Sequence, residues 1–505
     1  MNQHVLAVDA GTSSTRAIVF DGQGAAVSAV RRPVTSYRPH PGWVEQDPRD
    51  VWAATLDTAR AALAQAGIAA HALAGIGIAN QRETTVVWER ASGEPIHRAI
   101  VWSDRRTDRT CRTLREDGCE ALVAERSGLL LDPYFSATKI AWILDAVPGA
   151  RLRAERGELA FGTIDTFLLW YLSGGAVHAT DATNASRTAL FDIRAGRWDD
   201  DLLDLFRVPR AMLPQVMDTV GLFGTTRADR LGTPVPILAM AGDQQASMIG
   251  QACTQAGTIK ATYGTGAFVL LHTGGRAVRS TQRLLTTIAY QRDGARSYAL
   301  EGSVFSAGTS LDWLRDGLGI VSSAAEASQL AAQADPDQAV YLVPAFSGLG
   351  APHWSAAPNA MLIGLNGNTT RREIARAALE AVAYQTHDLV QAMWADARGA
   401  QASAGLRVDG GLAGSDWTMQ FLADMLRLPV ERAESVEATA MGVAYLAGWR
   451  AGLYADPLGA QRTFQPEHRF EPACDAVTRC ARLSGWHDAV ARLLHAPVRA
   501  EHAST

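Results

Sequence analysis

Short runs of apolar residues that end in Gly, Asp or Asn alternate with longer stretches whose apolar positions recur at helical spacing. This alternation predicts a mixed α/β chain in which buried strands are followed by helices. We expect strands over residues 5–8, 17–20, 76–79, 237–240 and 406–408. Helices are expected after residue 242, after the T-x-x-E capping box that begins at Thr370, and over 438–448.

One pattern occurs twice, about 250 residues apart along the chain. Residues 9–13 lie between two predicted strands near the start, and residues 263–266 lie between predicted strands over 258–261 and 268–271. The repeated unit of strand, Gly-Thr turn and strand predicts a duplicated two-domain protein with a boundary near residue 250. Two such turns facing each other could hold a polyphosphate, although Gly-Thr turns are also common hairpin connections.

The basic residues are strongly biased, because only Lys139 and Lys260 of the 47 basic residues are lysines. Neither lysine lies in a G-K-[ST] or V-A-I-K context, which excludes P-loop and protein-kinase phosphate sites. The net charge of −5 and the lack of a long basic run give no reason to expect a nucleic-acid partner.

The five cysteines form no C-x-x-C pair, so a zinc site is not expected, and a sparse odd set is typical of a reducing compartment. Asp9 interrupts the first apolar run before a signal peptide could form, and no stretch of about 18 apolar residues is present. We therefore expect a cytoplasmic protein without a membrane span.

The first Gly-Thr turn carries candidate phosphate chemistry. Thr12, Ser13 and Ser14 offer hydroxyl and backbone N–H donors, and Arg16 adds a cation. Asp9 ends a strand and would repel phosphate directly, so it is a candidate ligand of Mg²⁺, directly or through water. The alternative is a surface hairpin with a solvated aspartate.

Asp243 and Gln244 lie where a predicted strand ends and a helix begins. Ligands of open α/β sheets bind at the carboxyl ends of strands, which makes this pair a candidate site. An aspartate that only caps the helix is the alternative.

Arg82 and Glu83 are neighbours, and both can face one small ligand only if the preceding strand has already ended. Together they could bond several hydroxyls of a polyol, whereas a solvated loop pair is the alternative. Trp102, Tyr134 and Phe268 could wall a pocket, although aromatic residues more often belong to the core.

From residue 5 to about residue 470 the chain resembles the FGGY carbohydrate kinases. The resemblance is carried by P-G-W-V-E-Q-D-P at 41–48, N-Q-R-E-T-T at 80–85, D-P-Y-F-S-A-T-K at 132–139, T-D-A-T-N-A-S-R-T at 180–188, A-G-D-Q-Q at 241–245, T-Y-G-T-G at 262–266 and V-D-G-G at 408–411. It implies an α/β fold of two duplicated actin/hexokinase/Hsp70-like (ribonuclease H-like) ATPase domains. The active site would lie in the cleft between residues 1–250 and 251–505, with no expectation for the tail after about 472.

The N-Q-R-E-T segment is typical of members that phosphorylate glycerol, so the resemblance implies ATP- and Mg²⁺-dependent formation of sn-glycerol 3-phosphate. The glycerol hydroxyls would be bound by Arg82, Glu83, Tyr134, Asp243 and Gln244, and its carbons by Trp102 and Phe268. The phosphates and nucleotide would be bound by Thr12, Ser13, Ser14 and Arg16, with Thr265 opposite and Gly308 and Gly411 nearby. Asp243 would be the general base, and we expect a homo-oligomer, either a dimer or a tetramer.

Some positions depart from the family pattern. Ala10, Asp312 and Ser415 replace Gln, Gln and Asn, and A-P-H-W-S-A-A-P-N-A at 351–360 replaces A-P-Y-W-D-P-x-A-R-G. These changes leave two alternatives open: a kinase for a related polyol or triose, and a non-catalytic ATP-binding switch of the same fold. A switch would not need Arg82, Glu83, Tyr134 and Asp243 together.

Overall fold

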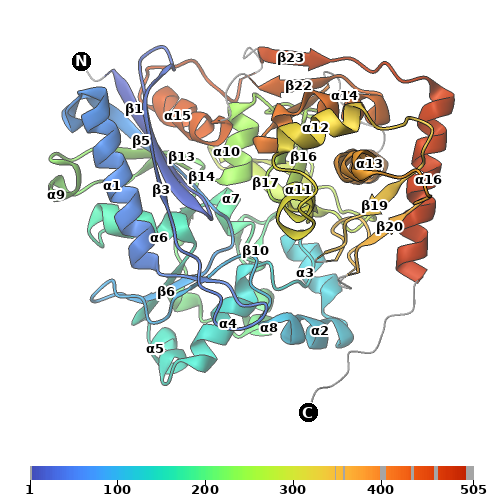
Figure 1. Cartoon of the computed structure of the whole chain (residues 1–505). Helices are drawn as coiled ribbons and strands as arrows, with labels where there is room; N and C mark the ends of the chain where they lie inside the picture. Colours follow the sequence, from blue (N-terminus) through green and yellow to red (C-terminus); the bar gives the residue numbers. More distant parts are fainter. Residues whose placement is uncertain are drawn as a thin grey trace.

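Two large β-sheets, one from each half of the chain, organise the fold (Figure 1). The computed structural model describes residues 3–346, 348–355, 359–397, 405–433, 437–459 and 464–495. Residues 356–358 of the divergent segment and residues 496–505 of the tail lie outside this part of the chain. No helix among the described residues is both long and apolar enough to cross a membrane.

The first sheet contains six strands in the order β13-β14-β5-β1-β2-β3. In that order the bounds are Val220–Thr225, Pro236–Gly242, Leu73–Asn80, His4–Ala10, Ser14–Phe20 and Ala26–Pro33. Strand β1 is antiparallel to β2 and parallel to β5, which is parallel to β14. The carboxyl ends of β1, β5 and β14 therefore meet at one edge of the sheet.

The second sheet contains seven strands in the order β17-β18-β16-β15-β21-β22-β23. In that order the bounds are Leu285–Arg292, Ala295–Val304, Ala267–Gly274, Ile259–Tyr263, Leu406–Asp409, Val430–Ala433 and Pro466–Phe470. Its antiparallel β18-β16-β15 meander and parallel β21 and β22 repeat the arrangement of β3-β2-β1, β5 and β14. The predicted duplication of the strand, turn and strand unit is confirmed; the domain boundary near residue 250 stays a prediction.

Helices and short strands surround the two sheets. Those of the first half are α1 (Pro48–Ala66), α2 (Asp108–Glu116), α3 (Glu120–Ser127), α4 (Ser136–Ala146), α5 (Ala150–Glu155), α6 (Ile164–Ser173), α7 (Ala182–Ala185), α8 (Asp200–Phe206), α9 (Ala228–Leu231) and α10 (Asp243–Gly250), with β4 (Glu45–Gln46), β6 (Val86–Glu89), β7 (Ala99–Ile100), β8 (Leu159–Gly162), β9 (Ala179–Asp181), β10 (Phe191–Asp192), β11 (Arg197–Trp198) and β12 (Gln215–Met217). Those of the second half are α11 (Gly308–Asp312), α12 (Ala324–Ala332), α13 (Arg371–Asp396), α14 (Asp416–Leu426), α15 (Ala438–Arg450) and α16 (Ala476–His495), with β19 (Tyr341–Val343) and β20 (Met361–Ile363). Thr370 and Glu373 form the predicted capping box of α13.

Two helices meet closely between the sheets. Helix α15 comes from the second half of the sequence but packs on β1, β5 and β14 of the first sheet and on α10. A Cβ on Gly250 would lie 1.9 Å from the carbonyl oxygen of Ala438, and one on Gly442 would lie 1.9 Å from that of Ala246. Glycine at these two positions lets α10 and α15 touch through their backbones, which fixes the helix that begins at Asp243.

Candidate active site

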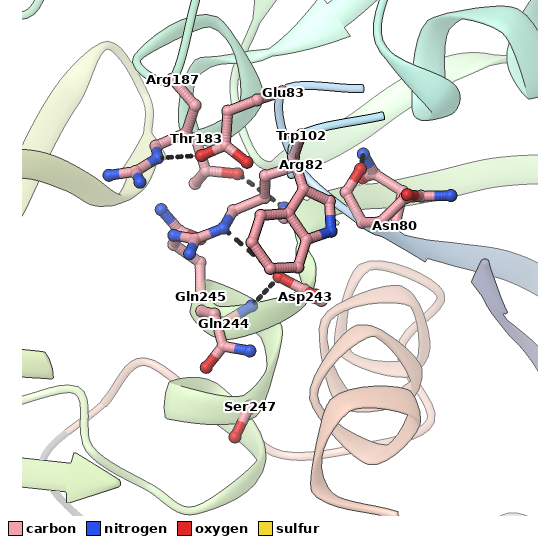
Figure 2. A network of polar contacts seen from close by, with 12 residues as sticks. Asn80, Arg82, Glu83, Trp102, Thr183, Arg187, Asp243, Gln244, Gln245 and Ser247 are labelled. Atoms are coloured by element: carbon pink, nitrogen blue, oxygen red, sulfur yellow. Dashed lines mark hydrogen bonds and ion pairs between the residues drawn. The ribbon is translucent and has the colours of Figure 1, made fainter. Parts of the chain in front are cut away.

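A buried network of four charged side chains lies between the two sheets. Arg82 Nη1 and Nη2 donate to the two carboxylate oxygens of Glu301 over 2.6 and 2.9 Å. Arg187 donates to Glu301 over 2.9 Å and to Glu83 over 2.6 Å, the latter contact being drawn in Figure 2. None of the four is more than 3% exposed. The solvated-pair interpretation of Arg82 and Glu83 is therefore wrong.

Glu83 turns into this network through an unusual backbone conformation. Strand β5 ends at Asn80, and Glu83 has φ of 61°, in the left-handed region that non-glycine residues rarely adopt. The hydroxyls of Thr85 and Ser136 donate to its carbonyl oxygen over 3.0 and 2.9 Å and hold the turn. The prediction that the strand ends before Arg82 is confirmed, and both side chains face inward.

The charges of the network nearly compensate one another. Burial favours the neutral form of Glu301, but Arg187 and Arg82 outweigh it and lower the pKa of that carboxyl below its usual value. Burial raises the pKa of Glu83, against the opposing effect of Arg187 and Arg82. Glu301 is thus the anion that holds both guanidiniums in place.

Asp243 lies at the junction between β14 and α10, next to this network. Its carboxylate lies 3.3 Å from Arg82 Nε and accepts a 2.7 Å hydrogen bond from the backbone N–H of Gln244 (Figure 2). The N-cap position belongs to Gly242, so Asp243 is the first residue of the helix and the cap interpretation is wrong. A Cβ on Gly242 would lie 2.7 Å from the Arg82 side chain, which explains the glycine there.

The junction is held from behind by Thr183. Its hydroxyl accepts a 2.9 Å hydrogen bond from the backbone N–H of Gly242 and donates to Asp181 over 2.8 Å. Burial raises the pKa of Asp243, whereas the positive charge of Arg82 opposes this rise. The Asp243 carboxyl group is therefore held in one position and is more basic than the carboxyl group of a solvent-exposed aspartate.

Three aromatic rings stand beside the charged network. The ring centroids of Trp102 and Tyr134 are 5.5 Å apart, and those of Trp102 and Phe268 are 6.1 Å apart, both edge to face. All three are only partly buried, and Trp102 Nε1 donates to the hydroxyl of Thr12 over 2.9 Å. Since Phe268 follows the second Gly-Thr turn, Trp102 links the two turns across the site.

The polar side chains of the first Gly-Thr turn differ in exposure and in their partners. Ser13 is exposed, while Ser14 is buried and its hydroxyl accepts a 2.7 Å hydrogen bond from Arg31. Arg16 Nη1 lies 2.5 Å from the carboxylate of Glu437, just before α15, so this cation already has an anionic partner. A phosphate group at the turn would compete with Glu437 for Arg16.

Asp9 is 9% exposed, and the solvated interpretation of this residue is wrong. Burial raises its pKa to about 7, with Arg16 opposing the rise and the carboxylate of Asp243 adding to it. Its carboxylate accepts no hydrogen bond from any residue that the structure describes. A divalent cation next to Asp9 would supply the missing positive charge, so the surroundings of Asp9 fit Mg²⁺.

The residues predicted near the nucleotide also converge. The backbone N–H of Gly308 donates to Gly264 O over 3.0 Å, and that of Thr309 donates to Thr265 O over 3.1 Å. A Cβ on Gly410, which precedes Gly411, would lie 2.3 Å from Tyr263 O, directly before the turn. The three segments that carry Thr265, Gly308 and Gly411 therefore form one surface at the end of β15.

Several polar residues of the site were not predicted. Arg187 lies in a motif that carried the family resemblance but was given no role, and Glu301 lies within a long strand without any local signal. Gln245 accepts from Arg82 over 3.3 Å. Lys260 lies in no phosphate-binding motif, and its being one of only two lysines is the one signal for it in the sequence.

The divergent positions have structural partners. Ala10 is buried in β1, Asp312 pairs with Arg315 at 3.0 Å, and the Ser415 hydroxyl caps α14 by accepting from the Thr418 N–H. His353 Nε2 lies 3.8 Å from a carboxylate oxygen of Asp388 in α13.

Comparisons with known proteins cover both halves of the chain. Residues 4–250 match the N-terminal domain, and residues 259–451 the C-terminal domain, of the FGGY family of carbohydrate kinases. A glycerol kinase of Methylobacterium nodulans is 57% identical over 501 residues, which are 99% of each chain. A glycerol kinase of Afipia carboxidovorans is 58% identical over 492 residues, 97% of this chain and 99% of its own.

A solved structure is similar as well. Plasmodium falciparum glycerol kinase with ADP matches with a TM-score of 0.90 at 31% identity, over 97% of this chain and 98% of its own.

Proposed function

Because the chain belongs to the FGGY family of carbohydrate kinases, we propose that it transfers the γ-phosphoryl group of ATP to glycerol, forming sn-glycerol 3-phosphate. The observation that carries the proposal is the convergence of Arg82, Glu83 and Asp243 beside three aromatic rings. The names and full-length similarity of the two bacterial relatives support glycerol as the substrate.

The site suits a small triol. Arg82 donates hydrogen bonds, Glu83 and Asp243 accept them, and Gln244 and Tyr134 contribute to the same polar corner. Trp102 and Phe268 face the carbon chain of the substrate. A buried site that is built to pair hydroxyls discriminates strongly against molecules that lack them.

Asp243 orients the acceptor hydroxyl and accepts its proton as the bond to phosphorus forms. Phosphoryl transfer through a loose transition state requires mainly in-line positioning and charge neutralisation, so a late proton transfer to a carboxylate is sufficient. The hydrogen bond from Gln244 N–H and the contact with Arg82 Nε keep the carboxylate directed at the hydroxyl.

The phosphates are bound from two sides in this proposal. Thr12, Ser13, Ser14 and Arg16 form one side and Thr265 the other, while Gly308 and Gly411 allow the nucleotide to approach the backbone. Asp9 would hold Mg²⁺, directly or through water, and the ion would neutralise charge on the transferring phosphoryl group. A cytoplasmic homo-oligomer, either a dimer or a tetramer, is part of the same proposal.

The test is a coupled assay of ADP release with Mg-ATP and a panel of polyols and trioses. We expect release that depends on glycerol, with glycerol 3-phosphate as the product. Faster release with another polyol would reassign the substrate, and slow release that no polyol changes would favour a non-catalytic ATP-binding switch.

A further inference from the structure

Both lysines of the chain lie at the proposed site, and both are completely buried. Lys139 Nζ donates to the carbonyl oxygen of Tyr134 over 2.8 Å and also to that of Pro133. Lys260 lies in β15 and reaches α10. In a chain whose other 45 basic residues are arginines, these are positions where a compact ammonium group has a distinct use.

The surroundings of Lys260 match an ammonium group. Its Nζ lies 2.6 Å from Gln244 Oε1, 2.8 Å from Thr262 Oγ1 and 3.3 Å from Ser247 Oγ. Three acceptors around one point satisfy the three N–H donors of lysine, whereas the planar fork of arginine needs acceptors that are spread out. Gln244 and Ser247 are three residues apart and lie on one face of α10.

Lys260 thereby joins the two halves of the protein. Residues 259, 261 and 263 of β15 face the core that contains α13, while Lys260 and Thr262 face the opposite side, towards α10. The hydroxyl of Ser247, which also contacts Lys260, donates a 2.9 Å hydrogen bond to Asp409 at the end of β21. The ammonium group therefore ties the helix that begins at Asp243 to two strands of the second sheet.

The contact also fixes the orientation of the Gln244 carboxamide. A lysine ammonium group only donates, so the carboxamide must turn its oxygen to Nζ and its N–H groups away. Figure 2 shows Gln244 directly beside Asp243, with the amide oxygen and nitrogen on opposite sides. The amide nitrogen has no acceptor among the residues that the structure describes, which leaves it available to a ligand hydroxyl.

We propose that Lys260 is a positioning residue for phosphoryl transfer. It turns the N–H groups of Gln244 towards the acceptor polyol and holds α10, with Asp243 at its first position, against the second sheet. This inference rests on the proposed function of the site and adds to it a residue that does not itself touch the substrate.

The first test compares Lys260→Met, Gln244→Met and the double variant, with the exposed Arg112→Met on α2 as a matched control. We expect Lys260→Met to raise the KM for glycerol by roughly 10- to 100-fold, the usual effect of losing a hydrogen bond to a charged group. The KM for ATP should change by less than about 3-fold, because Lys260 Nζ faces Gln244 on α10 and contacts neither Gly-Thr turn.

The double variant separates positioning from general stability. If Lys260 acts through Gln244, the second substitution adds little to the first. Additive effects, equal changes in both KM values, or full activity of Lys260→Arg would overturn the proposal. A wild-type protein without glycerol-dependent ADP release would instead refute the proposed function, so the two failures are distinguishable.

A second readout needs no variant of Lys260. Protein labelled with ¹³C at lysine Cε gives only two side-chain signals, which Lys139→Arg assigns. Glycerol should shift the Lys260 signal. Erythritol, a longer polyol added at the same concentration as a control, should shift it less. An unchanged Lys260 signal in glycerol-saturated, active enzyme would refute the positioning role.

Discussion

Asp243 combines three features at one residue: burial, a direct contact with Arg82 and a backbone hydrogen bond from Gln244. Asp243→Asn keeps the shape and the hydrogen bonds but removes the proton acceptor. We expect kcat to fall about 10²- to 10⁴-fold while the glycerol Kd changes by less than about 5-fold. Steady-state kinetics and calorimetric titration with glycerol measure the two effects, and a nearly normal kcat would exclude Asp243 as the base.

Sequence reasoning located the residues that follow strand ends but not their buried partners. Arg82 and Asp243 each come three residues after the end of a predicted strand, where ligands bind in open α/β sheets. Glu301 lies in the middle of β18, and its role depends on the folding of that strand next to Arg187 and Arg82. Such a counter-ion is set by tertiary contacts, which no local pattern contains.

At the scale of elements, a cluster around Asp388 attaches the C-terminal helix α16 to α13. Trp486 Nε1 donates to Asp388 over 2.7 Å, and His487 Nε2 lies 3.0 Å from its other oxygen. His353 and His387 lie at 3.8 and 3.4 Å. This arrangement gives the divergent histidine of the 351–360 segment a structural partner.

The cluster predicts pH-dependent stability. The hydrogen bond between His487 and Asp388 raises the pKa of His487 in the folded protein. The stabilisation from protonated His487 is therefore complete below about pH 6.5, the unfolded-state pKa, and is lost as the pH rises through the higher folded-state pKa. Burial favours neutral Asp388, but the bonds from His353, His387, His487 and Trp486 lower its pKa overall, so its contribution exists above about pH 4 and is lost on acidification.

His487→Gln should therefore destabilise the protein by about 0.5 kcal/mol at pH 5.5 and by less at pH 9, since the histidine is half exposed. Urea denaturation at both pH values measures the difference. The same loss at pH 9 as at pH 5.5 would show that the charge of His487 is not involved.

The elements themselves were largely predictable. The expected strands and the helices after residue 242, after Thr370 and over 438–448 are all present, because apolar runs and caps act locally. The packing of α15 on the first sheet was not predictable. It depends on a close backbone contact at Gly77 of β5, where a Cβ would lie 2.3 Å from the carbonyl oxygen of Val443 in α15, so it joins segments far apart in the sequence.

At the scale of the whole molecule, the charged network connects the two sheets. Arg82 and Arg187 come from the first half of the chain and Glu301 from the second. Glu301→Gln leaves two buried guanidiniums without their shared anion, and we expect a loss of about 3–5 kcal/mol in the free energy of unfolding.

Calorimetry should then show a lower Tm and separate transitions for the two halves. The matched control is Glu94→Gln, which removes an exposed partner of Arg49 and should leave the Tm nearly unchanged. Equal effects of the two substitutions would mean that the network does not couple the halves.

The burial of both lysines also determines how their side chains react with amine-modifying reagents. Acylating reagents and aldehyde cross-linkers reach lysine side chains only when they are accessible, and in the folded protein both are enclosed. Modification of either lysine therefore reports an opening of the structure around it. Lys139, against the backbone of Tyr134, and Lys260, between β15 and α10, therefore report how often the native fold opens at those two places.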